Sequence, residues 1–435
     1  MFKLRKLSKL ERSWVLYDVA NSAYILTVVT VLFPIYYDIV GGSLAQDDRD
    51  SLFMIITSII ALVTALMSPI IGSLSNYRGN KKKFFKLFFL VAVIGTLALI
   101  IPGLSYIALL GFFMISSISY GLTNVVYDAF LVDVTSEDRM DYVSSQGYAW
   151  GYIGSMIPFF IAIIPYGLVT FGILDGSQSV AGLSIEYLSI AFAFLVSLVW
   201  WYAYSIPLLR DVDQVYNVDE KHIVKQSFKR IANTFKDIKS YKYIFIFMIS
   251  YLFFIDVVNT VIRLAVTIGN SLNVGTSTLL GVVILVQLVA FPSAIIYGRL
   301  TEKYGGKQMI YVGILIYAIT IVTTFFINES TTFLMFVVGF LVGLAQGGIQ
   351  SISRSFFAKM LPIEKANEFF GFFSIFGRFA GIFSPFLLAI LIQYVSTNQA
   401  VLILLLPLSI GALLLYFVKP VKAEAKHVEV TLEDK

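Results

Sequence analysis

The sequence predicts an all-α membrane protein with twelve transmembrane helices in two pseudo-symmetric bundles of six. Of the 435 residues, 58% are hydrophobic and only 14% are charged, whereas soluble domains carry about 25% charged residues. The apolar residues gather in long runs, and the basic residues gather between the runs. This pattern is typical of a polytopic membrane protein. It argues against a soluble enzyme, and we expect no enzymatic activity.

Twelve apolar segments follow one another along the chain. Most are long enough for a helix to cross a bilayer, which takes roughly 20 residues. They are far longer than the strands of a membrane barrel, so we expect helices. The segments cover approximately residues 13–38, 51–76, 84–102, 105–133, 141–172, 184–206, 243–269, 276–300, 308–327, 332–360, 366–396 and 398–419.

The one sizeable polar stretch between spans divides the chain into four parts. We expect an N-terminal six-helix bundle over 1–206, a cytoplasmic linker over 207–242, a C-terminal six-helix bundle over 243–420 and a disordered tail over 421–435. Within the linker, apolar residues recur at near-helical spacing among Lys and Arg. This pattern fits either an amphipathic helix on the inner leaflet or a solvated linker helix.

The distribution of basic residues predicts the orientation. Nearly all Lys and Arg lie in the termini, in the linker and in the loops on the same side, and Arg49 alone falls in a loop on the far side. The positive-inside rule therefore places both termini and the linker in the cytoplasm of a multi-pass plasma-membrane protein. We expect no nucleic-acid partner, because the basic residues belong to these short loops.

Several kinds of chemistry are absent from the sequence. The chain has no cysteine and only two histidines, both in polar segments, so we expect no metal site and no other cofactor. A proton relay inside the membrane would have to use carboxylates. No P-loop motif occurs, which argues against direct use of ATP.

Matched positions indicate that the two halves are repeats. Gly72 and Gly298 follow the second and eighth segments, and Gly151 and Gly377 lie in the fifth and eleventh. Both pairs have the same offset of 226 residues (298 − 72 and 377 − 151). The order of the matches predicts a duplication of a six-helix unit.

The first and seventh segments carry matched polar residues. Asp18 and Asn21 correspond to Asp256 and Asn259, and Tyr24 continues the polar stripe of the first segment. Asp18 fits either an interfacial position near the cytoplasm or a helix face that lines a pathway. Two nearby carboxylates at matched depth would suit proton coupling or the binding of an ammonium group.

Two more residues at the 226-residue offset carry opposite charges. Asp128 and Arg354 both lie near the predicted cytoplasmic ends of their spans. We expect them to form an ion pair that closes the cytoplasmic mouth. The alternative is pairing within each bundle, of Asp128 with Arg78 or Arg139 and of Arg354 with Glu302 or Glu364.

Arg378 lies near the middle of the eleventh segment. A guanidinium at this depth is costly unless it is paired. We expect Arg378 either to contact the substrate or the gate, or to form a structural ion pair.

The loops after segments two and eight carry the pattern by which a large family is known. A glycine is followed four residues later by an acidic position and then by a second glycine with basic residues. This resembles the signature loop of the major facilitator superfamily, whose plan is two parallel six-helix repeats. Asn76 stands where the acid is usual, whereas Glu302 keeps the carboxylate. The signature-loop residues are Gly72, Asn76, Arg78 and Gly79 in the first half and Gly298, Glu302 and Gly305 in the second.

Three segments resemble a narrower branch, the vacuole effluxers of fungal autophagy and their bacterial relatives. The first segment matches from Trp14 to Tyr24, the fifth from Gly147 to Gly154, and the tenth from Gly348 to Pro362. The fourth departs, because Asp128 stands where the branch has Asn. The resemblance implies a secondary transporter, and the fungal members are associated with amino-acid efflux.

We therefore expect a secondary active transporter that moves a small polar or zwitterionic, amino-acid-like solute by alternating access, with proton coupling. We expect a monomer whose partners are the solute, protons and membrane lipids. The alternative is a flippase or transporter of lipids or lipid-linked precursors on the same fold. The candidate substrate and coupling residues are Asp18, Asn21, Tyr24, Asp256, Asn259, Gln350 and Arg378.

Overall fold

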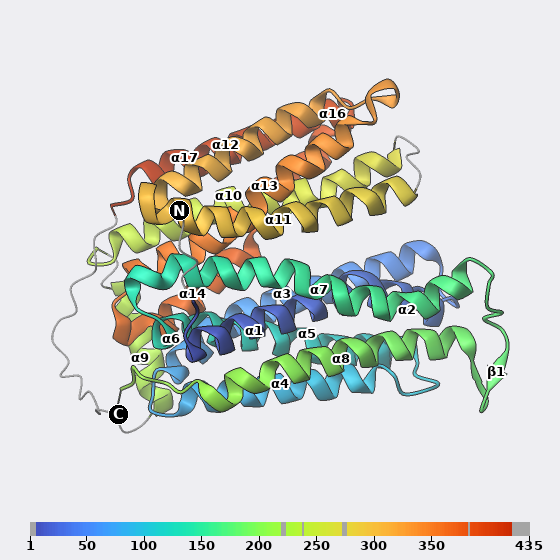
Figure 1. Cartoon of the computed structure of the whole chain (residues 1–435), viewed down its shortest axis with the longest axis horizontal. Helices are drawn as coiled ribbons and strands as arrows, with labels where there is room; N and C mark the ends of the chain where they lie inside the picture. Colours follow the sequence, from blue (N-terminus) through green and yellow to red (C-terminus); the bar gives the residue numbers. More distant parts are fainter. Residues whose placement is uncertain (1–5, 219–222, 237–238, 272–275, 382, 420–435) are drawn as a thin grey trace.

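The computed structural model consists of two groups of long helices that lie side by side (Figure 1). It describes residues 6–218, 223–236, 239–271, 276–381 and 383–419. The start of α1, the end of α17 and the short helix α9 lie at one end of the molecule, which we call the linker end. A β-hairpin lies at the other, the hairpin end. The predicted tail over 421–435 lies outside the described residues.

The N-terminal bundle contains the helices of the first half of the chain. It consists of α1 (Lys9–Ala23), η1 (Tyr24–Leu32), α2 (Phe33–Val40), α3 (Gln46–Ser75), α4 (Asn80–Ala98), α5 (Tyr106–Ala129), α6 (Leu131–Val134), η2 (Glu137–Arg139), α7 (Met140–Thr170) and α8 (Ile185–Asp211). The antiparallel strands β1 (Ser179–Val180) and β2 (Leu183–Ser184) form the hairpin between α7 and α8.

The first span begins with a capping box and then changes its winding. Ser8 Oγ accepts a hydrogen bond from the Glu11 N–H, and the Glu11 carboxylate accepts one from the Ser8 N–H. These bonds satisfy donors that every helix N-terminus leaves free. The middle of the span, η1, is a π-helix. Pro34 follows it and has no N–H to donate, which favours a local change of winding.

The C-terminal bundle repeats this arrangement. It consists of α10 (Lys242–Ser271), α11 (Thr276–Tyr304), α12 (Gly306–Phe325), η3 (Glu329–Thr331), α13 (Leu334–Met360), η4 (Ile363–Lys365), α14 (Ala366–Phe379), α15 (Phe383–Leu391), α16 (Thr397–Ala400), η5 (Val401–Leu404) and α17 (Leu405–Tyr416). The eleventh span is broken between α14 and α15, where Gly381 has a φ of 100° that favours glycine.

Within the described residues, ten helical segments are long and apolar enough to cross a membrane. Two further helical segments complete the twelve spans of the predicted fold class. One is α4, whose first two turns carry several lysines, and the other is the shorter apolar run Val401–Tyr416. The all-α membrane fold with two six-helix halves is confirmed.

The linker is attached to the N-terminal bundle. The helix α8 continues past residue 206 to Asp211, and α9 (Ile223–Lys236) lies against α3, where Ser73 Oγ donates to the Ser227 carbonyl (3.3 Å). Between these helices, Gln214 donates to the carbonyls of Ser75 and Asn76 (3.0 and 3.2 Å). The linker thus binds the loop between α3 and α4.

The two bundles contact each other toward the linker end, where glycines allow their backbones to approach. A Cβ on Gly371 of α14 would lie 2.6 Å from the Ser68 carbonyl oxygen of α3. A Cβ on Gly298 of α11 would lie 2.7 Å from Ser145 Cβ of α7. Toward the hairpin end the two groups of helices diverge (Figure 1). The linker end of the interface is therefore closed.

Candidate functional site

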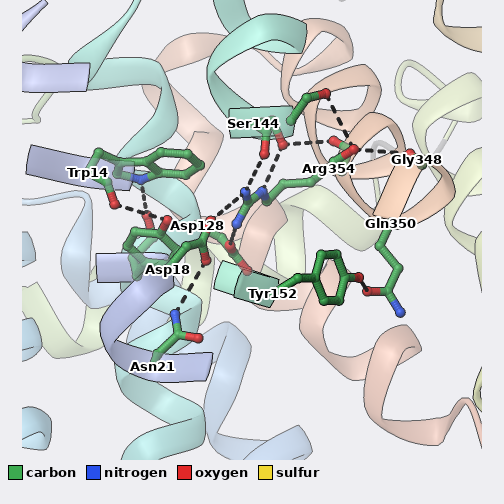
Figure 2. A network of polar contacts seen from close by, with 12 residues as sticks. Trp14, Asp18, Asn21, Asp128, Ser144, Tyr152, Gly348, Gln350 and Arg354 are labelled. Atoms are coloured by element: carbon green, nitrogen blue, oxygen red, sulfur yellow. Dashed lines mark hydrogen bonds and ion pairs between the residues drawn. The ribbon is translucent and has the colours of Figure 1, made fainter. Parts of the chain in front are cut away.

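Arg354 of α13 lies at the closed interface and binds carboxylates of the opposite bundle. Its Nη2 atom lies 2.9 Å from Asp18 Oδ2 on α1, and its Nη1 atom lies 3.1 Å from Asp128 Oδ1 on α5 (Figure 2). Arg354 and Asp18 are buried, with 2% and 7% of their surface exposed. A buried guanidinium needs such partners because unpaired burial of its charge is costly.

The N-terminus of α7 supplies further acceptors. Arg354 Nε donates to Ser144 Oγ (3.0 Å), and Nη2 donates to the Ser144 carbonyl (3.2 Å). Ser144 Oγ donates in turn to the Ser351 carbonyl of α13 (2.7 Å). Each guanidinium nitrogen of Arg354 therefore has an acceptor on the N-terminal bundle.

Aromatic rings complete the surroundings of this guanidinium. The Arg354 Cζ atom lies 4.5 Å from the ring centroids of both Trp14 and Tyr148, and 5.7 Å from that of Tyr127. Trp14 and Tyr127 stack with centroids 4.7 Å apart. Each also donates to the other's backbone carbonyl, at 3.1 and 3.2 Å. Ring faces attract cations, most strongly where water is excluded. We call these rings, with Asp18, Asp128 and Ser144, the Arg354 pocket.

Gly147 makes room for this pocket. A Cβ at this position would overlap Asp18 Oδ2 and lie 3.1 Å from Arg354 Nη2. Asn21 donates to Asp18 Oδ1 at 3.4 Å, from one turn further along α1. The glycine that the sequence analysis matched to the effluxer branch thus allows the ion pair to form.

The predicted pair of Asp128 and Arg354 is present. Arg139 instead binds Glu11, with Nε 2.6 Å from Oε1. Asp18 shares the same guanidinium, which was not predicted from the sequence. Asp18 and Arg354 lie in unmatched spans, so the repeat offset gave no signal for their contact.

A second cross-bundle ion pair lies one helical turn nearer the linker end. Asp141 of α7 binds Lys359 Nζ of α13 and accepts a hydrogen bond from Ser355 Oγ (2.6 Å). The Lys359 side chain is 27% exposed. From the sequence, Lys359 was predicted only to lie at the cytoplasmic edge of the tenth span. No sequence pattern links Lys359 to Asp141.

Two of the candidate residues, Tyr24 and Asp256, have their hydrogen-bond partners within their own bundles. Tyr24 was expected on the pathway-lining stripe, but its hydroxyl bonds Ser116 Oγ (2.6 Å) and its ring packs against Trp201 inside the N-terminal bundle. Asp256 was expected near Asp18. Its carboxylate instead accepts hydrogen bonds from the N–H groups of Gly381 and Ser384 (2.7 Å for Ser384). It therefore caps the N-terminus of α15.

Two of the remaining candidates, Gln350 and Arg378, contact the opposite bundle. Gln350 of α13 accepts a hydrogen bond from the Tyr152 hydroxyl of α7 (3.3 Å), and Asn259 is half-buried on α10. Arg378 reaches across to α5, where its guanidinium would overlap a Cβ on Gly121. The Arg378 Nε is buried and has no hydrogen-bond partner among the described residues.

The signature loops hold the ends of neighbouring helices. Gly79 and Gly305 have φ values of 70° and 89°, which favour glycine. A Cβ on Gly72 would overlap the Asn367 carbonyl of the opposite bundle.

The polar residues of the signature loops lie toward the surface or the linker. Arg78 and Glu302 are exposed. The backbone carbonyl of Asn76 accepts a hydrogen bond from the Val218 N–H of the linker (2.9 Å). The linker therefore contacts the first signature loop at the position where the acid is missing.

The part of the chain that the structure describes contains no group of His, Cys, Asp or Glu side chains that could hold a metal ion.

Two repeated six-helix halves are the plan of the major facilitator superfamily. The structure aligns with the crystal structure of FucP, a transporter of this superfamily, in the outward conformation. The TM-score is 0.69 at 12% identity, with 94% of this chain and 98% of that chain covered.

Sequence comparison identifies the branch. Residues 8–429 match the family model described as "Vacuole effluxer Atg22 like", and the chain belongs to this family. It is 42% identical over 422 residues to the uncharacterized MFS-type transporter YxiO of Bacillus subtilis, covering 95% of this chain and 96% of YxiO. It is 23% identical over 383 residues to autophagy-related protein 22 of Saccharomyces cerevisiae, covering 75% and 70% of the two chains. The protein is therefore a multi-pass membrane protein and a secondary active transporter.

Proposed function

We propose that this transporter moves a small zwitterionic, amino-acid-like solute across the plasma membrane by alternating access, and that protons drive the cycle. The observation that carries the proposal is the buried Arg354 ion pair, which joins the two bundles only at the linker end. A contact of this kind favours one conformer by its differential energy. Because the same cluster holds the coupling candidate Asp18 and the gate residues, protonation and gate opening share one site.

The orientation follows from charge. The linker end carries nearly all basic residues outside the spans, which supports a cytoplasmic location under the positive-inside rule. On this orientation the closed linker end corresponds to an outward-facing state. The word "effluxer" in the family description supports export as the direction.

Proton coupling is supported by the charge balance of the Arg354 pocket. Asp18 and Asp128 share one guanidinium, so the three groups together carry one excess negative charge. A proton on either carboxylate would neutralise that excess and weaken the ion pair. Protonation would thereby favour opening of the linker end.

Substrate contact is assigned to Arg378. Its guanidinium lies at the interface beside Gly121, and its buried Nε has no acceptor among the described residues. Unsatisfied buried donors are costly, and a solute carboxylate would supply the missing acceptor. This pairing favours a solute with a carboxylate, such as an amino acid, over a solute without one.

A binding screen followed by transport tests the proposal. Purified protein is heated with amino acids, nucleosides, short peptides and lipids, and a ligand of the folded state raises the unfolding temperature. Hits are then assayed for counterflow and pH-driven transport in proteoliposomes. The proposal requires a zwitterionic hit whose transport follows the pH gradient and is lost in Arg378→Ala. Stabilisation by lipids alone would favour the flippase alternative instead.

A further inference from the structure

Among the described residues, the acceptors that bind the Arg354 guanidinium and the rings that lie against it all belong to the N-terminal bundle. The two carboxylates come from α1 and α5, the Ser144 acceptors come from α7, and the rings belong to Trp14, Tyr127 and Tyr148. Arg354 is the one contribution of the C-terminal bundle to this set. The pocket is thus a site on one bundle that holds a cation supplied by the other.

We propose that the Arg354 pocket is a binding site for a monovalent organic cation with a guanidinium or primary ammonium group. Arg354 fills the site while the linker end is closed, and the free cation fills it when the linker end is open. The inference rests on the alternating access of the proposed function, and it adds a ligand class and a regulatory effect to that function.

The pocket is held together without Arg354. Trp14 and Tyr127 stack and exchange two hydrogen bonds with each other's backbone, and Asn21 holds Asp18 through its Oδ1 atom. These contacts lie within the N-terminal bundle, so movement of α13 does not break them. A pre-formed site loses little conformational entropy when it binds a ligand.

When Arg354 leaves, the negative charge of the pocket favours the binding of another cation. Asp18 has 7% of its surface exposed, and its carboxylate and that of Asp128 are then left without their cation. Two neighbouring carboxylates of like charge are unfavourable without a counter-charge, and burial of one of them adds to the cost. A cation of the size and planarity of the arginine head group matches the acceptors at 2.9 to 3.2 Å and the ring centroids at 4.5 Å.

Competition with Arg354 has a direct consequence for the transport cycle. A cation in the pocket occupies the position that Arg354 needs for closure. Because a ligand shifts an equilibrium toward the state that it binds better, the cation holds the linker end open. Organic cations on the linker side therefore inhibit transport at high concentration, whereas the same cations on the hairpin side do not.

The binding test uses a variant in which the pocket is empty. Purified Arg354→Ala and Arg354→Gln proteins are titrated with methylguanidinium, with methylammonium and with methylurea as the neutral control, and unfolding temperature and tryptophan fluorescence are measured. We expect saturable stabilisation by the two cations and none by methylurea. Adding Asp18→Asn should weaken the binding about thirtyfold or more, because it removes a buried charge partner. Equal effects of methylguanidinium and methylurea in either folded variant, or binding that Asp18→Asn leaves unchanged, would overturn the proposal.

The closure test uses the protein with Arg354 in place. A cysteine at Ser145, which is buried in the closed interface, is labelled in proteoliposomes with a membrane-impermeant thiol reagent on the linker side. Methylguanidinium on that side should raise the labelling rate, and methylurea should not. A rate that rises on acidification but not with methylguanidinium would mean that protons alone replace Arg354, and the cation site would be refuted. Neither the binding test nor the labelling test requires transport. Both can therefore be interpreted even if the proposed solute transport is not found.

Discussion

Asp18 Oδ2 lies 2.9 Å from Arg354 Nη2, although 336 positions separate the two residues in the chain. The contact joins the first span to the tenth and therefore joins the two bundles. Asp128 binds the same guanidinium at 3.1 Å. The closing contact at the linker end is thus one arginine held by two carboxylates, rather than a simple pair.

Removal of this arginine is expected to open the linker end. Arg354→Gln should raise the labelling rate of a Ser145→Cys reporter about 5- to 150-fold, which corresponds to a coupling energy of about 1–3 kcal/mol. Asp18→Asn and Asp128→Asn should each have a smaller effect, because the other carboxylate remains. In double-mutant cycles with Arg354→Gln, both should show non-additive effects. Additivity at both positions would mean that the cluster does not act as a gate.

The ion pair between Asp141 and Lys359 is expected to contribute less to closure. The Lys359 side chain is 27% exposed, and partly solvated pairs are worth roughly 0.2–1 kcal/mol. Lys359→Gln should therefore raise the same labelling rate by no more than about fivefold, and high salt should reduce the difference from the wild type. A larger effect than that of Arg354→Gln would mean that the Lys359 ion pair contributes more to closure than the Arg354 cluster does.

Glycine contacts give a test that changes no charge. A Cβ on Gly371 would lie 2.6 Å from the Ser68 carbonyl oxygen, whereas a Cβ on Gly377 of the same helix would meet nothing nearer than 3.6 Å. Gly371→Ala should disfavour closure by about 1–3 kcal/mol, as overpacked contacts do, and Gly377→Ala should not. Labelling of the linker-side reporter compares the two variants. Equal labelling in both would place the closing contact elsewhere.

Asp256 is expected to behave as a helix cap and not as a coupling group. Asp256→Ala leaves two N–H groups at the start of α15 without their acceptor, which should lower stability by about 1–3 kcal/mol. Asp256→Asn keeps one acceptor oxygen and should lose less. Both Asp256 variants should keep the pH dependence of transport, whereas Asp18→Asn should abolish it. An Asp256→Asn protein that folds normally but has lost its pH dependence would restore Asp256 as a coupling residue.

The membrane orientation can be tested with a pair of single cysteines. Ser177 is exposed in the loop at the hairpin end, and Lys229 is exposed on α9 at the linker end. Ser177→Cys should react with an impermeant reagent applied to intact cells, and Lys229→Cys should react only after the cells are lysed. Ser227 is unsuitable as a probe because it is buried. The opposite labelling pattern would invert the topology.

The sequence determined much of the architecture by itself. Long apolar runs leave a helix as the conformation that satisfies its backbone in lipid, so the spans and the fold class could be read from the chain. The repeat offset paired Asp128 with Arg354, because matched positions of two repeats meet near the axis that relates them. The signature loops were also visible, since tight turns need glycine at positive φ.

Tertiary structure decided which polar residues meet. The helical stripe of the first span grouped Tyr24 with Asp18, but Tyr24 packs against Trp201 and bonds Ser116 inside its own bundle. Asp256 matches Asp18 in the repeat, but the break at Gly381 gives Asp256 backbone partners that Asp18 does not have. Asp18 met Arg354, and Asp141 met Lys359, across an interface between non-equivalent helices. Periodicity describes the faces of one helix, whereas contacts between helices depend on where each helix bends, breaks and crosses its neighbours, and those features arise only when the whole chain packs.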